Sequence, residues 1–286
     1  MADGSAKLEL LTMMTSSFYS KLSQNGVTLL ELLIVLMIIG LLITAAVKTM
    51  DVSLQRSRFS TTVKELDNLS WAIAGNSELI AGGKRSDFGY IGDLGVLPPT
   101  LKDLNENYSN FPAWQGPYIK SAFQENPESY KIDAWGDTYI YPNPNTIVDT
   151  SPVYVRSYAG TSIATPENWL TKLIANRKKD LTSNTVEGNF KDAYGTLLGA
   201  SDKDTVWVKI YLPILGRKDS TYTQFIALKS RYEFTAISVG NHILKAIAVH
   251  HDTLPIWDSV EKYICVYPRV GATGIDVRFP AIRFGD

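Results

Sequence analysis

The sequence predicts an α+β chain: a long N-terminal helix packed on a small antiparallel sheet, followed by a C-terminal all-β sandwich. Three observations predict this. An almost uninterrupted apolar stretch lies near the N-terminus, apolar residues then recur at helical spacing, and short alternating segments fill the C-terminal part. The predicted segments are a polar leader at 1–26, the long helix at 27–81, a globular region at 82–164, a helical and polar connector at 165–204, and the sandwich at 205–286.

The composition is that of a globular chain with a local apolar segment. The 286 residues are 45% hydrophobic and 20% charged, with a formal net charge of −1. Because there is no basic excess, we expect no nucleic-acid partner. The single cysteine, Cys265, excludes an intrachain disulfide and a thiolate metal cluster, and we interpret it as a small core residue.

The apolar stretch from Val27 to Val47 has the length of a membrane span. Its 21 residues would form a helix of about 31 Å, close to the roughly 30 Å hydrocarbon core of a bilayer. A secretory signal has a shorter apolar region, of about 7–15 residues, and a cleavage site after it. Here the apolar region continues into more predicted helix. We therefore expect it to remain in the mature protein as a single transmembrane helix.

Glu31 is the unexpected residue of this stretch. A lone carboxylate facing lipid costs a few kcal/mol at the bilayer centre and needs a partner or a route to the interface. Cleavage after Gly26 would place a new amino terminus on Val27, one helical turn from Glu31, and that amine in a neighbouring subunit is a natural counter-charge. The alternative is a carboxylate that reaches the headgroups and pairs with nothing.

The stretch 26–35, GVTLLELLIV, resembles the class III signal of type IV pilins and type II secretion pseudopilins. The resemblance implies that prepilin peptidase cleaves between Gly26 and Val27 and methylates Val27, and that Glu31 is the intersubunit glutamate. It further implies other pilin or pseudopilin subunits and an inner-membrane assembly platform with its ATPase as partners. The implied location is the bacterial inner membrane, single-pass, with a cytoplasmic leader and periplasmic globular domains, and then the filament after assembly.

The signal departs from the family pattern in two respects. Val27 stands where an aromatic residue is usual, and no proline occurs between Gly26 and Leu97, where many members have a helix-kinking proline. The leader is also long, and the start of translation is open between Met1, Met13 and Met14.

A second resemblance, to the globular region of major pseudopilins, rests on a Gly-Pro-Tyr segment and an Asp-x-Trp-Gly-x-x-Tyr segment. The matching residues are Gly116, Pro117, Tyr118, Asp133, Trp135, Gly136 and Tyr139. With the signal, the likeness spans about 27–162. Major pseudopilins often hold calcium near here, but the carboxylates Asp133, Asp137, Asp149 and Glu167 match no calcium loop, so we expect no cofactor and leave calcium open.

Helical spacing continues beyond the apolar stretch. Apolar residues recur three, four or seven positions apart, which predicts one buried helix face, and Gly82-Gly83 is expected to end the helix. The predicted face consists of Val52, Phe59, Val63, Leu66, Leu69 and Ile73. Thr165-Pro166-Glu167 predicts a further helix start. The strands after Thr205 predict a sandwich of immunoglobulin-like or transthyretin-like type.

No catalytic constellation is recognised, and the chain is not expected to be an enzyme. His250 and His251 would point to opposite faces of a strand, so no zinc site is predicted. Three hypotheses follow from the sequence: a type II secretion pseudopilin, a minor type IV pilin with an adhesive or capping C-terminal domain, and a bitopic membrane-anchored binding or enzyme domain. The lack of a disulfide pair favours the first, the extra domain favours the second, and Glu31 argues against the third.

Overall fold

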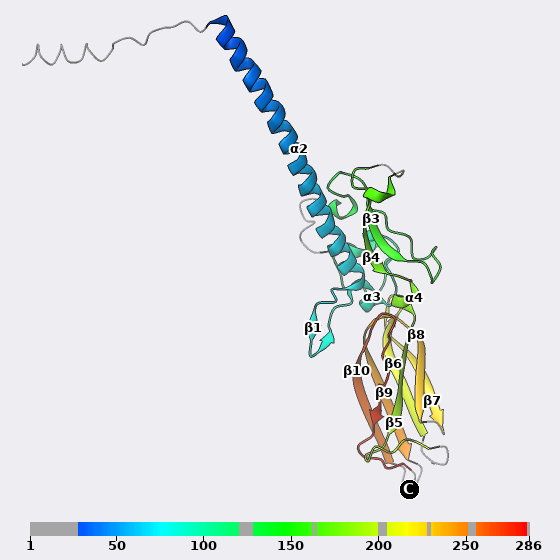
Figure 1. Ribbon diagram of the computed structural model, residues 1–286. Helices are drawn as coiled ribbons and strands as arrows, with labels where there is room; N and C mark the ends of the chain where they lie inside the picture. The colour runs from blue at the N-terminus through cyan, green and yellow to red at the C-terminus, as the bar shows by residue number, and fades with distance from the viewer. Residues whose placement is uncertain are drawn as a thin grey trace, which may run out of the picture. The chain divides into compact units, whose positions relative to one another are not determined.

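The computed structural model confirms the α+β class and describes residues 28–119, 128–161, 163, 165–199, 205–227, 230–250 and 256–284 (Figure 1). The chain divides into two compact units, Met1–Arg56 and Ser57–Asp286. The first unit contains most of the apolar part of the long helix. The second contains the rest of that helix and all strands.

The long helix α2 runs from Leu29 to Ala74, so the predicted end at 81 is wrong. It stops at Gly75, whose φ of +78° is the left-handed conformation that commonly ends a helix. The Arg85 guanidinium then donates hydrogen bonds to the Ala74 and Gly75 carbonyls, which have no partner inside the helix. The Gly82-Gly83 pair, expected to end the helix, is instead the turn between β1 (Ile80–Ala81) and β2 (Lys84–Arg85).

The predicted helix face is buried only over its second half. Leu66, Leu69 and Ile73 are buried, whereas Val52 and Phe59 are about half exposed. The buried face begins at Thr62, which is fully buried and continues the spacing toward the N-terminus. The apolar spacing therefore runs further along the helix than the packing does.

The first hydrophobic core surrounds this buried face. Its helical elements are α3 (Gly89–Leu94), the 3-10 helices η1 (Leu101–Leu104) and η3 (Ser129–Lys131), and α4 (Lys179–Thr182). A small antiparallel sheet is formed by β3 (Val153–Ser157) and β4 (Leu170–Ala175). The largest fully buried side chains of this core include Tyr90, Tyr130, Ile91 and Leu94.

The helical connector expected at 165–204 is wrong. Behind Thr165 there is only one 3-10 turn, η4 (Pro166–Asn168), and the chain then enters β4. A second strand, β5 (Asn184–Lys191), follows the short helix α4. The alternation buried–intermediate along β5 places Val186 and Phe190 in a core, a period of two that the polar composition of the segment conceals.

The C-terminal part is a two-layer β structure around a second core. One sheet has the order β10 (Ile256–Val266), β9 (Gly240–His250), β6 (Thr205–Ile214) and β7 (Arg217–Ala227), and the other has the order β11 (Val277–Arg278), β5 and β8 (Arg231–Ile237). The four-stranded sheet is antiparallel throughout. Because β5 belongs to the second sheet, the sandwich takes in residues before 205.

Backbone hydrogen bonds join the two cores. The Val239 N–H donates to the Leu181 carbonyl at 2.9 Å, and the Gly216 N–H donates to the Leu94 carbonyl, also at 2.9 Å. Gly95 lies so close to β6 that a Cβ there would be 2.1 Å from the Pro213 carbonyl oxygen. The region after Ser57 is therefore one compact unit containing both cores.

Candidate functional site

Thr28 begins the helix that carries the predicted assembly residue. Its hydroxyl oxygen accepts a hydrogen bond from the Glu31 N–H at 3.2 Å, and its carbonyl accepts one from the Leu32 N–H at 3.1 Å. Thr28 is therefore the N-cap of α2, and Glu31 is the third residue of the first turn. The Thr-x-x-Glu spacing is that of a capping box, a signal for the role of Thr28 that sequence reasoning missed.

Glu31 is exposed and its neighbours along α2 are apolar. The side chains on both sides of it along α2 are exposed, including Leu30 at 68% and Leu32 at 54%. The Glu31 carboxylate forms no ion pair with any residue that the structure describes, Lys48 and Arg56 included. Its position in the first helical turn is favourable for a negative charge, because the helix dipole is positive there.

The other two predicted site residues, Gly26 and Val27, lie outside the described residues. The helix that follows them is long and apolar enough to cross a membrane, with a mean hydropathy of 2.8 over its most apolar 18 residues and none of that window buried. Among the described residues of the first unit, these apolar side chains have no protein core to pack against. They fit an environment of lipid or of other helices.

Asp133 organises the Asp-x-Trp-Gly-x-x-Tyr segment. One carboxylate oxygen accepts hydrogen bonds from the N–H groups of Trp135 and Asp137, both at 2.9 Å. The other accepts a hydrogen bond from the Ser157 hydroxyl on β3. Gly136 has a φ of +94°, which explains the glycine in this turn. These contacts engage both carboxylate oxygens of Asp133. Separately, the described residues contain no group of three or more His, Cys, Asp and Glu that could hold a metal ion.

Tyr139, the last residue of the same segment, reaches the long helix. Its hydroxyl donates to Glu65 Oε2 at 2.6 Å, and the nearby Ala134 N–H donates to the Thr62 hydroxyl at 3.2 Å. Burial raises the pKa of Glu65, the hydrogen bond from Tyr139 lowers it, and the negative charge of Asp133 raises it further, with a net upward shift. The segment therefore fastens the globular region onto α2.

The Gly-Pro-Tyr segment also packs against the first core. The Gly116–Pro117 peptide bond is cis, and the Trp114 ring lies over Gly116. The Tyr118 hydroxyl donates to Asp93 Oδ2 at 3.0 Å, and its ring makes an edge contact with Tyr90 at a centroid distance of 5.3 Å. Both globular motifs thus have structural roles within the second unit, whereas Glu31 belongs to the first.

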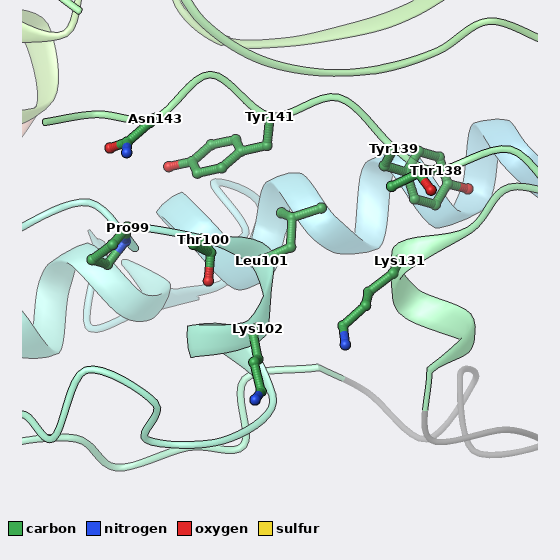
Figure 2. Close-up of a pocket in the computed structure, with 9 residues that line it drawn as sticks. All are labelled: Pro99, Thr100, Leu101, Lys102, Lys131, Thr138, Tyr139, Tyr141 and Asn143. Atoms are coloured by element: carbon green, nitrogen blue, oxygen red, sulfur yellow. The ribbon is translucent and has the colours of Figure 1, made fainter. Parts of the chain in front are cut away.

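A cavity of about 290 Å³ opens beside η1 and η3 (Figure 2). Its walls are mostly apolar, and Figure 2 shows Lys102 and Lys131 on one side of it and the rings of Tyr139 and Tyr141 on the other. Lys102 is paired with Glu106 at 3.3 Å, and Lys131 is paired with Glu128. The Thr100 hydroxyl donates to Asp103 Oδ2 at 2.8 Å, but this contact belongs to the capping box of η1. We therefore interpret the cavity as space beside a structural cap, with no recognisable reaction chemistry. It is lined by Pro99, Thr100, Leu101, Lys102, Lys131, Thr138, Tyr139, Tyr141 and Asn143.

The histidines give no metal site within the described residues. His242 is buried, and its Nε2 lies 2.9 Å from the Ser238 carbonyl oxygen. Burial lowers the pKa of His242, and the contact with Ser238 opposes that shift. The side chain of His250 and the whole of His251 lie outside the described residues.

Comparison with known proteins assigns the N-terminal segment. Residues 21–47 match the family model of the prokaryotic N-terminal methylation motif. No curated protein matches the chain, and no solved structure matches it. The match covers Gly26, Val27 and Glu31, together with the apolar part of α2 up to Val47.

The N-terminal region is thus pilin-like. A signal of this type implies processing by prepilin peptidase and assembly with other pilin subunits. Together with the exposed apolar helix, it indicates a single-pass membrane anchor.

Proposed function

We propose that the chain is a structural, non-catalytic subunit of a filament anchored in the bacterial inner membrane, most similar in role to a pseudopilin of type II secretion. The observation that carries the proposal is the methylation-motif match over a helix whose only carboxylate in the apolar stretch, Glu31, forms no ion pair with any described residue. A plain membrane anchor gains nothing from Glu31. A subunit that must align with its neighbours does.

The proposed site consists of Gly26, Val27 and Glu31. The leader lies in the cytoplasm, prepilin peptidase cleaves after Gly26, and Val27 becomes the methylated amino terminus. Because Thr28 caps the helix, Glu31 is held within the first turn, close to the level of that terminus. A neighbouring subunit displaced along the filament axis can then pair its Val27 ammonium with Glu31.

Assembly follows from the surface of α2. The apolar side chains between Leu29 and Val47 leave the lipid and pack against equivalent helices of other subunits, with little change in the polarity of their surroundings. The pairing of Glu31 with an ammonium group sets the register, since an unpaired carboxylate in that bundle is costly. An inner-membrane platform and its ATPase would supply the work of extraction, and the globular regions would lie in the periplasm.

The globular motifs favour a pseudopilin. Tyr139 and Asp133 are used in the way expected of residues that hold a globular region on a pilin helix. The second candidate is a minor type IV pilin, and the sandwich formed around β5 to β11 favours it. A domain of that size at the filament surface suits a minor or tip subunit better than a closely packed major one.

The first test is the intact mass of the protein isolated from its native membrane. We expect a mass that begins at Val27 and includes one added methyl group, and a full-length mass would contradict the proposal. In the same strain, Glu31→Ala should leave insertion and cleavage intact but reduce the sheared or cross-linked filament fraction at least about tenfold, the effect of losing about 1.4 kcal/mol per contact.

Thr44→Ala is the matched control for Glu31→Ala. Thr44 is another polar residue of the same apolar helix, but its hydroxyl is satisfied by the Gly40 carbonyl at 2.8 Å. Its replacement should leave assembly unchanged. Deletion of the gene should block protein secretion if the chain is a pseudopilin, and should alter surface pili with secretion intact if it is a minor pilin.

A further inference from the structure

The outer surface of the four-stranded sheet carries a group of aromatic and large aliphatic side chains. Strand pairing and the burial of the alternate residues place one set of side chains of β6, β9 and β10 on the side facing away from the second core. We call this surface the aromatic face. Its residues are Trp207 and Tyr211 on β6, Ile243 and Ile247 on β9, and Trp257 and Tyr263 on β10.

The aromatic face is open to solvent. Trp257 is 66% exposed, Tyr263 is 72% exposed and Trp207 is 43% exposed. The alternate residues of the same strands, such as Val208 and Ala246, are fully buried in the sandwich core. The buried side of these strands therefore has its own apolar residues, and Trp257 and Tyr263 lie mostly in solvent on the opposite side.

The register of the paired strands determines the distances between the aromatic rings. Tyr211, Ile243 and Tyr263 lie side by side in one cross-strand row, so the two tyrosines are about 10 Å apart across β9. Trp207 lies four residues along β6 from Tyr211, about 13 Å away. Trp257 lies at the same end of the sheet as Trp207. The rings form two groups, one of tyrosines and one of tryptophans, at opposite ends of the face.

Between these groups lies a row of charges. Lys209 on β6 is directly opposite Lys245 on β9, and Lys245 is opposite Glu261 on β10. Two like charges directly opposite each other destabilise a sheet. Neither lysine forms an ion pair of 4.0 Å or less with another residue in the described part of the chain. The row therefore has net positive charge at the centre of the face.

The size of the face argues against a protein partner of ordinary affinity. The rings and charges cover about 20 Å along the strands and about 15 Å across them, roughly 300 Å². Stable protein–protein interfaces bury about 800 Å² on each partner. A narrow, extended ligand that lies along or across the strands needs no larger area.

We propose that the aromatic face binds a linear acidic polysaccharide. The C–H groups on one side of a sugar ring stack on the negative faces of Trp and Tyr rings, and such rings at both ends of the face suit a chain of several sugars. A carboxylate on a sugar between them would meet Lys209 and Lys245 and offset their mutual repulsion. Binding at this face does not depend on cleavage at Gly26 or on Glu31.

The test is calorimetric titration of the full chain in detergent micelles with two matched hexasaccharides. One is β-1,4-linked mannuronate, and the other is β-1,4-linked mannose, which has the same backbone without carboxylates. We expect the acidic hexamer to bind about tenfold more tightly than the neutral one. The double variant Lys209→Gln/Lys245→Gln should abolish that difference, and high salt should reduce it.

The aromatic contribution is tested separately. Trp257→Ala should weaken binding of the acidic hexamer about five- to tenfold. Tyr222→Ala is the control, because Tyr222 is 40% exposed on the same sheet but is paired with Ile210 and points to the other side. It should leave binding unchanged.

Several results would overturn the proposal. These are no binding of either hexamer, equal effects of Trp257→Ala and Tyr222→Ala, or equal affinity for the acidic and neutral hexamers. Concentration-dependent self-association that Trp257→Ala abolishes would instead assign the face to contacts between copies of the chain. The mass of the processed protein reports on the proposed function alone, so the two proposals can fail independently.

Discussion

The Tyr139 hydroxyl donates a hydrogen bond of 2.6 Å to Glu65 Oε2, joining the globular region to the long helix. Tyr139 is only 4% exposed, and Glu65 is partly buried beside Asp133. The two residues are 74 positions apart, so the contact closes a long segment of chain onto α2. Together with the hydrogen bond from the Ala134 N–H to Thr62, it adds polar contacts to the apolar packing that holds α2.

The first prediction concerns this contact. Tyr139→Phe removes the donor and leaves the Glu65 carboxylate partly buried with one partner fewer, so the free energy of unfolding should fall by about 1–3 kcal/mol. Urea denaturation of the detergent-solubilised chain, followed by near-UV circular dichroism, measures the change. Tyr108→Phe is the control, since Tyr108 is 58% exposed, and it should change the stability by less than about 0.5 kcal/mol. Equal stability of the two variants would contradict the role of the contact.

The second prediction concerns pH. Burial raises the pKa of Glu65 above its ordinary value of 4.5 in the folded chain. Between the unfolded and the folded pKa the folded state binds more protons, so the contribution of Glu65 to the free energy of unfolding decreases as the pH rises through this window. Glu65→Gln keeps an acceptor for Tyr139 and removes the titration.

The measurement for this second prediction is the urea midpoint as a function of pH from 4 to 8. Relative to wild type, Glu65→Gln should gain stability as the pH rises, and the difference between the two proteins should level off above the folded pKa. A difference that is constant over the whole range would show that Glu65 has an ordinary pKa. Tyr139→Phe should lose more stability at high pH than at low pH, because the carboxylate then carries its charge.

The pilin-type signal could be predicted from sequence because its chemistry is local. Gly26, Val27 and Glu31 lie within one short segment, and a carboxylate in an apolar helix is conspicuous wherever it occurs. The α+β class could be predicted for a similar reason, because the apolar stretch and the alternation after Thr205 are strong sequence signals, and the structure confirms it.

The elements that the sequence mispredicts depend on contacts between residues that are distant from each other in the sequence. Strand β5 has a polar composition, and only its pairing with β8 and its packing in the second core make it a strand. The sequence predicts a helix end at Gly82-Gly83, because two glycines are a stronger local signal than one. Gly75 ends the helix instead, since Arg85 and Asp87 fold back onto the end of α2.

The roles of Glu65 and Thr28 are likewise seen in the structure. In the sequence Glu65 stands beside Lys64 and Asp67 like any residue of a polar helix surface, and only the position of Tyr139 shows that it is held in a contact. Thr28 is one of the few polar residues in an otherwise apolar stretch. Its spacing from Glu31 was available in the sequence and indicates a cap.

The last prediction tests the helix end at Gly75. A Cβ at this position would lie 2.3 Å from the Asp87 carbonyl oxygen and 2.5 Å from Phe88 Cα, both of them backbone atoms. Gly75→Ala therefore adds a steric clash to the cost of the left-handed conformation, which by itself is about 1–2 kcal/mol. Gly82→Ala has the second cost alone, because Gly82 has a φ of +58° and nothing within 4 Å of its Cβ position. Thermal unfolding should thus show a clear loss for Gly75→Ala and a smaller loss for Gly82→Ala. Equal losses would mean that the turn after Ala74 can move away from Asp87, and that the end of α2 is set by glycine conformation without the packing of the chain around Phe88.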